Sequence, residues 1–205
     1  MVHGERFNSI THLVGAALAL AGMVVLVVLA SLQGDVWKII GFSIYGVSLF
    51  TLYTLSTLYH SLQGRAKQIL KKLDHAAIYL LIAGSYTPIT LVTLHGAWGW
   101  SLFGIVWGLA IVGIWVDTLH KDGRRALQMI IYLLMGWLIL VALSPLIQAL
   151  PRRALELLVL GGVFYTGGMV FYALDERMRH AHGIWHLFVL AGSVSHFVVM
   201  LRYVL

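Results

Sequence analysis

The chain of 205 residues contains no cysteine, only three prolines, and few charged residues, which make up 11% of the total. The absence of cysteine excludes a disulfide framework and a thiolate-ligated metal site. The scarcity of charge argues against an ordinary soluble domain, in which about a quarter of the residues are charged and keep the surface hydrated. A disordered chain requires low hydrophobicity, and 60% of these residues are hydrophobic.

Acidic residues are the scarcer charged type, with 8 Asp and Glu against 14 Lys and Arg and a net charge of +6. A basic chain can bind nucleic acid, but these basic residues lie in short clusters between apolar runs and form no basic face or nucleic-acid motif. We therefore expect no nucleic-acid partner and interpret the positive charge as a record of membrane topology.

Seven apolar runs, each close to the roughly 20 residues that cross a bilayer as a helix, occupy most of the chain. The alternation of a membrane barrel is missing, and only helices or barrels satisfy their backbone in lipid. The sequence thus predicts an all-α fold, a seven-transmembrane-helix bundle that forms a single membrane domain over residues 1–205. The predicted spans are 9–32, 37–62, 73–94, 97–118, 126–148, 153–174 and 183–204.

Basic residues are distributed unevenly between the two sets of connections. The N-terminus and the connections after the second, fourth and sixth spans carry ten Lys and Arg, and the opposite set carries four. The positive-inside rule therefore predicts a cytoplasmic N-terminus and an outside C-terminus. The ten residues are Arg6, Arg65, Lys67, Lys71, Lys72, Lys121, Arg124, Arg125, Arg177 and Arg179.

Proline and glycine predict local features of the spans. Pro88 and Pro145 lie inside predicted spans and are expected to kink them. Gly104 and Gly108 form a G-x-x-x-G pattern, which permits close approach of helices. We expect this pair to serve ordinary packing within the bundle and not a dimer seam.

Ionisable residues inside membrane spans are energetically costly and indicate function. The predicted topology brings polar residues of four separate segments to the same, cytoplasmic, end of the bundle. These residues are Glu5, Asn8 and His12 in the first span, His60 in the second, Asp74 in the third, and His182 and His186 in the seventh.

The spacing of these residues suggests a metal site. His182 and His186 are four residues apart and share one helix face, as in the H-x-x-x-H pairs that chelate zinc. A third imidazole from His60 would complete a His₃ site with a fourth position for water. Asp74 could hydrogen-bond that water and take its proton. Ser56 lies one turn before His60 and could support the site or stabilise an oxyanion.

The other histidines favour ordinary roles. His196 lies ten residues after His186, or about 15 Å along the helix, so it cannot share a metal with His182. We expect it to mark a second polar spot deeper in the bundle. His180 is interpreted as a loop residue and His75 as interfacial, and solvated positions are expected for His3, His95, Asp117 and His120.

Four segments carry a family resemblance: E-R-F-N-S-I-T-H at 5–12, S-T-L-Y-H at 56–60, the run 72–88 that contains K-L-D-H, and the run 182–197 that begins H-G-I-W-H. In this order and at the ends of the predicted spans, they make the chain similar to the hemolysin III family of bacterial inner-membrane proteins. That family is related to the progestin and adipoQ receptors, in a superfamily that includes the alkaline ceramidases.

The resemblance covers the whole chain and implies a Zn²⁺ ion bound by His60, His182 and His186. It also implies that Asp74 faces the metal through water and that Ser56 supports the site. The inner (plasma) membrane is the implied location. The soluble N-terminal region of the animal receptors does not appear in this sequence, so we do not expect a protein-hormone receptor.

Three functions are compatible with these features. The first is a zinc-dependent hydrolase of a lipid acyl amide or ester, similar to a ceramidase and involved in membrane lipid homeostasis, with membrane lipids as partners. The second is a non-enzymatic sensor or receptor of lipids or membrane state, in which zinc is structural. The third, suggested by the family name, is a pore-forming cytolysin, although the span pattern is that of a resident bundle.

Overall fold

The computed structural model describes residues 4–119 and 125–205, and the regular structure in these ranges is entirely helical. Seven helical segments are long and apolar enough to cross a membrane, which confirms the predicted seven-helix bundle. Of the sequence expectations, those for His3, Lys121, Arg124 and the solvated His120 fall outside the described residues. The seven segments are Arg6–Gln33, Val36–Ser61, Gly64–Thr93, Ala97–Leu119, Arg125–Ala149, Arg152–Ala173 and Ala181–Val204.

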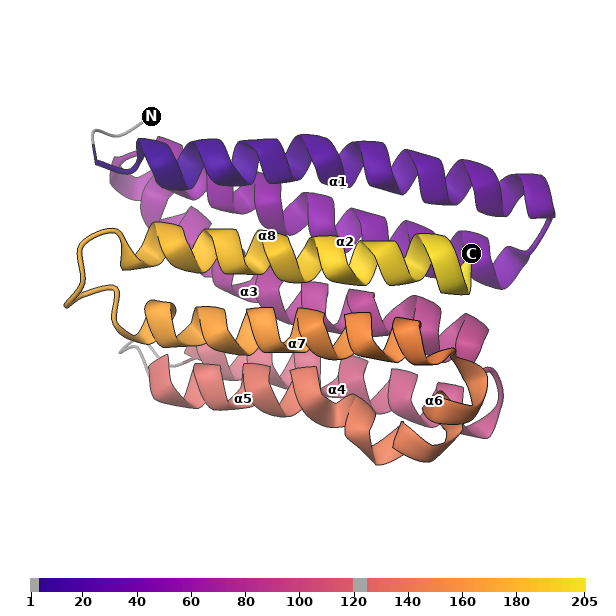
Figure 1. Cartoon of the computed structure of the whole chain (residues 1–205). Helices are drawn as coiled ribbons and strands as arrows, with labels where there is room; N and C mark the ends of the chain where they lie inside the picture. Colours follow the sequence, from indigo (N-terminus) through magenta and orange to yellow (C-terminus); the bar gives the residue numbers. More distant parts are fainter. Residues whose placement is uncertain (1–3, 120–124) are drawn as a thin grey trace.

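Eight α-helices and three shorter helical segments make up these spans (Figure 1). The α-helices are α1 (Arg6–Gln33), α2 (Val36–Ser61), α3 (Gly64–Pro88), α4 (Ala97–Leu119), α5 (Arg125–Trp137), α6 (Leu143–Ala149), α7 (Arg152–Ala173) and α8 (Ala181–Val199). The shorter segments are η1 (Ile89–Thr93), η2 (Leu138–Ala142) and η3 (Met200–Val204).

The third span begins earlier than predicted, at Gly64 instead of residue 73. The residues 64–72 include four Lys and Arg, so their hydropathy does not indicate a membrane segment. Lys, Arg, Gln, Ala and Leu are nevertheless strong helix formers, and they extend α3 beyond its apolar part. This extension brings the side chain of Lys67 to the N-terminal segment, where it pairs with Glu5.

Both internal prolines coincide with irregular helix, as predicted. Pro88 ends α3 and is followed by the π-helical turn η1, in which the N–H of Leu94 donates to the carbonyl of Ile89 (2.8 Å). Pro145 lies in α6, directly after the 3-10 segment η2. A proline ring clashes with the carbonyl four residues earlier, here Val141 within η2, so a regular α-helix cannot continue through this point.

The hydroxyl of Tyr86 in α3 forms hydrogen bonds with the backbone where α5 ends and η2 begins. It lies 2.8 Å from the carbonyl oxygen of Met135 and 2.9 Å from that of Gly136, and it accepts the N–H of Ile139 at 2.9 Å. Backbone groups freed by a helix break need such partners, because lipid offers none. The break is therefore a fixed part of the fold.

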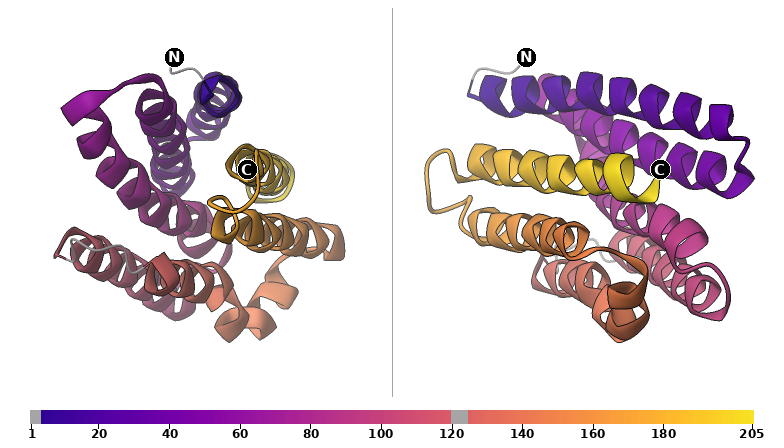
Figure 2. Two further views of the ribbon diagram at one scale, coloured as in Figure 1. Left: turned by 90° about the vertical axis from the view of Figure 1, so that its left-hand side faces the viewer. Right: turned by 45° about the vertical axis from the view of Figure 1, so that its right-hand side comes forward.

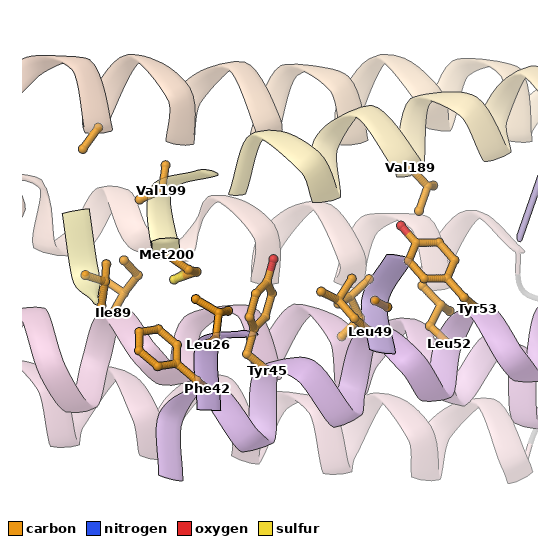
Figure 3. Close-up of a cluster of buried hydrophobic side chains, with 14 of the residues drawn as sticks. Leu26, Phe42, Tyr45, Leu49, Leu52, Tyr53, Ile89, Val189, Val199 and Met200 are labelled. Atoms are coloured by element: carbon orange, nitrogen blue, oxygen red, sulfur yellow. The ribbon is translucent and has the colours of Figure 1, made fainter. Parts of the chain in front are cut away.

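Six helices, α1, α2, α3, α5, α7 and α8, surround the interior, and contact between α1 and α8 closes the ring (Figure 2). α4 packs outside this ring, against α3 and α5. Figure 3 shows Tyr45 and Tyr53 extending from α2 among buried aliphatic side chains. The outer surface carries large exposed apolar side chains that suit contact with lipid, among them Leu18, Val28, Ile111, Trp115, Leu134 and Val141.

The G-x-x-x-G pair of α4 faces outward, so the expectation that it packs within the bundle was wrong. Gly104 and Gly108 are exposed, and a Cβ built at either position would meet no other atom within 4 Å. Two other glycines of this helix permit close packing: Gly113 against the ring of Tyr79, and Gly99 against backbone. A Cβ there would collide with the carbonyl oxygens of Thr90 and Leu94 in the preceding turn.

Replacing these glycines by alanine should therefore have opposite effects. Gly99→Ala should lower the free energy of unfolding by about 1–3 kcal/mol, because rigid backbone atoms must move. Gly104→Ala, in the same helix, should leave stability unchanged or slightly raised, since alanine is the better helix former. Thermal unfolding of the purified variants in detergent measures both, and equal melting temperatures would contradict the packing described for α4.

Candidate metal centre

His60, at the end of α2, meets His182 and His186, in the first turns of α8. One ring nitrogen from each lies within 4.8 Å of the other two, and the Nε2 atoms of His60 and His182 are 3.2 Å apart. His60 and His186 are buried, and His182 is partly buried. The structure thus brings together the three ligands predicted from the sequence, in a group that could hold a metal ion.

Carboxylates accept hydrogen bonds from the Nδ1 atoms of two of these imidazoles. The Nδ1 atom of His60 lies 3.0 Å from the carboxylate of Glu5, and Nδ1 of His182 lies 2.8 Å from that of Asp175. Ionised carboxylates only accept hydrogen bonds, so each Nδ1 carries the hydrogen and each Nε2 presents a lone pair. A carboxylate behind the imidazole is the usual support of a metal-bound histidine.

The third imidazole is oriented by the backbone of α1. Nδ1 of His186 lies 3.2 Å from the carbonyl oxygen of Asn8, which also only accepts, so Nε2 again presents a lone pair. This Nε2 is buried and has no hydrogen-bond partner in the described part of the chain. Three nitrogen lone pairs therefore converge without a donor, and those of His60 and His182 repel each other unless a cation or a proton lies between them.

Each supporting carboxylate is itself paired with a basic residue. Glu5 lies 2.5 Å from the ammonium of Lys67 in α3, and Asp175 lies 2.7 Å from the guanidinium of Arg125 at the start of α5. Partial burial opposes ionisation of Glu5, but its hydrogen bonds with Lys67 and His60 hold its pKa below the ordinary value. Glu5 is consequently a carboxylate at neutral pH, as the hydrogen bond from His60 requires.

Sequence reasoning placed Glu5 and Asn8 at this depth without giving them a role, and it missed Asp175 entirely. Asp175 belongs to the connection between α7 and α8, seven residues before His182. No helical repeat relates the two residues, because turns intervene. The only signal was a pair of adjacent acids, Asp175 and Glu176, in a basic connection, which solvent exposure would explain equally well.

Asp74 and Ser56 lie beside the centre. Asp74 in α3 is 4% exposed and Ser56 in α2 is 1% exposed, and the Ser56 hydroxyl makes no hydrogen bond with the described residues. Neither belongs to the group of converging metal-ligand atoms. The role of Asp74 and Ser56 as a supporting pair for the three histidines stays a prediction.

An interior cavity of about 120 Å³ is walled mainly by apolar side chains of the six ring helices. None of the three histidines lines it, but His12 does, and the ring of His12 stacks on that of His186. His12 and Asp74 contribute to its wall near the histidines, and Tyr165 and His196 contribute deeper in the bundle. The ring of His196 lies 3.2 Å from the carbonyl oxygen of Leu158. His196 is thus a polar spot apart from the three-histidine group, as expected.

A second hollow, of about 380 Å³, lies over His182 at the end of the bundle. Its wall comes from the start of the chain and from the connection between α7 and α8. The three-histidine group therefore lies between an apolar interior and a polar outer hollow. Among the polar residues of this outer hollow are Asn8, Asp175, Glu176, Arg177, Arg179 and His180.

The remaining expectations have mixed outcomes. His180 is exposed in the connection before α8, and His95 is exposed, as predicted. The expectation of a solvated Asp117 was wrong, because it lies in α4 and accepts a hydrogen bond from the amide of the buried Gln128. The same amide lies 3.2 Å from Nδ1 of His75, so His75 belongs to this network between helices.

A bundle of seven membrane-spanning helices, with a buried histidine group able to hold a metal, defines a class of multi-pass membrane protein. The family model described as "Haemolysin-III related" matches residues 1–197, and the chain belongs to this family. This confirms the resemblance drawn from the sequence motifs.

Named relatives agree with this assignment. The chain is 43% identical to Hemolysin-3 of Bacillus cereus over 205 residues, covering 100% of this chain and 93% of that protein. It is 43% identical to the Hemolysin-3 homolog of Bacillus subtilis (strain 168) over 200 residues, with coverages of 97% and 93%. It is 29% identical to the Monocyte to macrophage differentiation factor of Homo sapiens over 206 residues, with coverages of 96% and 82%.

Removing the supporting carboxylates should weaken metal binding. Glu5→Gln and Asp175→Asn should each lower the affinity for Zn²⁺ by about 10- to 100-fold, because the neutral amides no longer fix and polarise the imidazoles. Glu156→Gln is the matched control, since Glu156 is exposed and pairs with Arg152. Competition with a chromogenic chelator measures the affinities, and equal values for all three variants would contradict the supporting role.

Proposed function

We propose that this chain is a zinc-dependent hydrolase that cleaves an acyl amide or ester of a membrane lipid. The observation that carries the proposal is the position of three converging imidazole lone pairs next to His12, whose ring stacks on that of His186 and lines an apolar cavity together with Asp74. A buried carboxyl near a metal centre and an apolar space that accepts part of an acyl chain are the parts that such a reaction requires.

The donor set fits zinc. Three neutral imidazoles that each present Nε2, with no cysteine in the chain, are the ligands of many catalytic zinc sites, which leave a fourth position open. Zinc bound there would lower the pKa of a coordinated water towards 7 and polarise a carbonyl group. The supporting hydrogen bonds to Glu5, Asp175 and the Asn8 carbonyl hold the hydrogen of each neutral ring at Nδ1 and leave the lone pair at Nε2, as metal binding requires.

The chain's own residues would supply the proton transfers. Asp74 would take the proton of the water that attacks the acyl carbonyl, and it would return a proton to the departing amine or alcohol. The C–N or C–O bond breaks, and the products are a carboxylic acid and the amine or alcohol. Ser56, buried one turn before His60 and without another partner in the described residues, would donate its hydroxyl to the Asp74 carboxyl and orient it.

The two hollows suit the two reactants. The cavity of about 120 Å³ has apolar walls for an acyl chain, and the outer hollow over His182 offers a polar route for water. With the orientation predicted by the positive-inside rule, the centre faces the cytoplasm and the substrate comes from the inner leaflet. We propose the bacterial inner membrane as the location, and turnover of its lipids as the process.

A sensor with a structural metal is the second candidate. The centre connects α2 and α8, and its supporting residues extend to the start of α1 and the α7–α8 connection. A metal would therefore fasten several elements together, as a conformational switch would require. A cytolysin ranks lowest: the name Hemolysin-3 belongs to relatives, and the closed ring of helices suits a resident membrane protein.

Asp74→Asn separates the hydrolase from the sensor. The asparagine keeps the shape of the side chain but cannot take a proton, so hydrolysis should fall by about 10²- to 10⁴-fold while zinc content stays unchanged. The measurement is mass spectrometry of liposomes that contain ceramides, other N-acyl lipids and phospholipids, incubated with the zinc-loaded proteins.

Asp35→Asn is the matched control. Asp35 caps α2 by accepting the N–H groups of Trp37 and Lys38, and asparagine caps helices equally well. This variant should retain the wild-type rate. If wild type and Asp74→Asn leave every lipid class equally intact, the hydrolase is rejected and the sensor is favoured.

A further inference from the structure

His12 in α1 is a buried imidazole without a partner. Its side chain is 2% exposed, and neither ring nitrogen makes a hydrogen bond with the residues that the structure describes. A neutral imidazole has one N–H donor and one acceptor nitrogen, and burying either of them unpaired is costly. A polar group that does not belong to the described chain would remove this cost.

His12 is not a fourth ligand of the metal centre. Its ring stacks on that of His186, with centroids 3.6 Å apart and planes inclined by only 10°. A metal bound at Nε2 of His186 lies in the plane of that ring, whereas the lone pair of His12 lies in the parallel plane. Zinc–imidazole bonds are about 2.0–2.1 Å long, so one ion cannot be in line with both lone pairs.

The ring of His12 is held in place by packing. The ring of Tyr53 packs edge-on against it, with ring centroids 5.0 Å apart. The hydroxyl of Tyr53 donates to Ser193 at 2.6 Å, so its hydrogen is not shared with His12. His12 also forms part of the wall of the interior cavity, together with Asp74. A fixed, unpaired imidazole thus borders both the three-histidine group and the apolar space.

We propose that His12 donates its ring N–H to the carbonyl oxygen of an acyl lipid bound in the cavity and so positions this carbonyl beside the metal centre. The inference deepens the proposed function and rests on it for the acyl class of ligand. It requires no change of protonation, since a neutral imidazole is the donor. A buried donor that is already oriented toward the reacting group binds it without rearrangement.

The test follows the carbonyl itself. The probe is N-methylpalmitamide labelled with ¹³C at its carbonyl, added to the zinc-loaded full chain in phosphatidylcholine vesicles and observed by isotope-edited infrared spectroscopy. Wild type should show a bound carbonyl band at lower frequency than the free probe in vesicles. His12→Phe keeps a stacking ring but has no donor, so the band should move up and the affinity should fall about tenfold.

Two further variants make the result specific. His12→Gln retains an N–H donor and should keep most of the downward shift. His95→Phe makes the same replacement at an exposed histidine and should behave as wild type. Zinc content and melting temperature identify any variant that has lost the metal centre. If His12→Phe has lost it, the proposal is judged on the other two proteins: wild type should bind the probe with a shifted band, and His12→Gln should keep most of that shift.

The proposal is overturned if folded, zinc-loaded His12→Phe keeps the wild-type band and affinity, which would mean that His12 bonds only to water or serves packing. It is overturned as well if wild type shows no shifted band. Failure of the hydrolase looks different: no lipid is cleaved by wild type, yet the shifted band is present and disappears with His12→Phe.

Discussion

Three nitrogen lone pairs that face one another in a buried space are the constraint around which this molecule is arranged. The Nε2 atoms of His60 and His182 approach to 3.2 Å, and Nε2 of His186 completes the group without a hydrogen-bond donor in the described part of the chain. Alone, this arrangement is repulsive. It becomes favourable when a cation occupies the centre, and the oxygen atoms that fix each Nδ1 prevent the rings from turning to relieve it.

The other elements of the fold position this centre and enclose the cavity near it. α2 and α8 present the imidazoles, while the start of α1 and the α7–α8 connection supply the oxygens that orient them. Lys67 and Arg125 neutralise the supporting carboxylates, so little uncompensated charge accompanies the site. The ring of six helices then encloses an apolar cavity against which His12 and Asp74 lie. Outward-facing apolar side chains hold this assembly in lipid, where helix breaks need internal partners such as the Tyr86 hydroxyl.

The seven spans and the meeting of the three histidines were predictable because bilayer thickness, helical periodicity and alternating topology are recorded directly in the sequence. The early start of α3 was not predictable from hydropathy, because the residues that extend this helix are good helix formers but several of them are charged. The role of Asp175 was not predictable either, since turns of irregular geometry in the α7–α8 connection place it beside His182. The stacking of His12 depends on the relative rotation of α1 and α8. The outward face of Gly104 likewise depends on α4 lying outside the ring, a position that no local pattern encodes.

X-ray absorption spectroscopy at the zinc edge of the purified, zinc-loaded chain tests the central claim most directly. A centre built from His60, His182 and His186 should give about three imidazole nitrogens at roughly 2.0–2.1 Å, together with a lighter oxygen shell and no sulfur. The imidazole signal should disappear, along with the zinc, when all three histidines are replaced by alanine. A spectrum of oxygen ligands alone, or zinc retained with the same imidazole signal in the triple variant, would contradict the account.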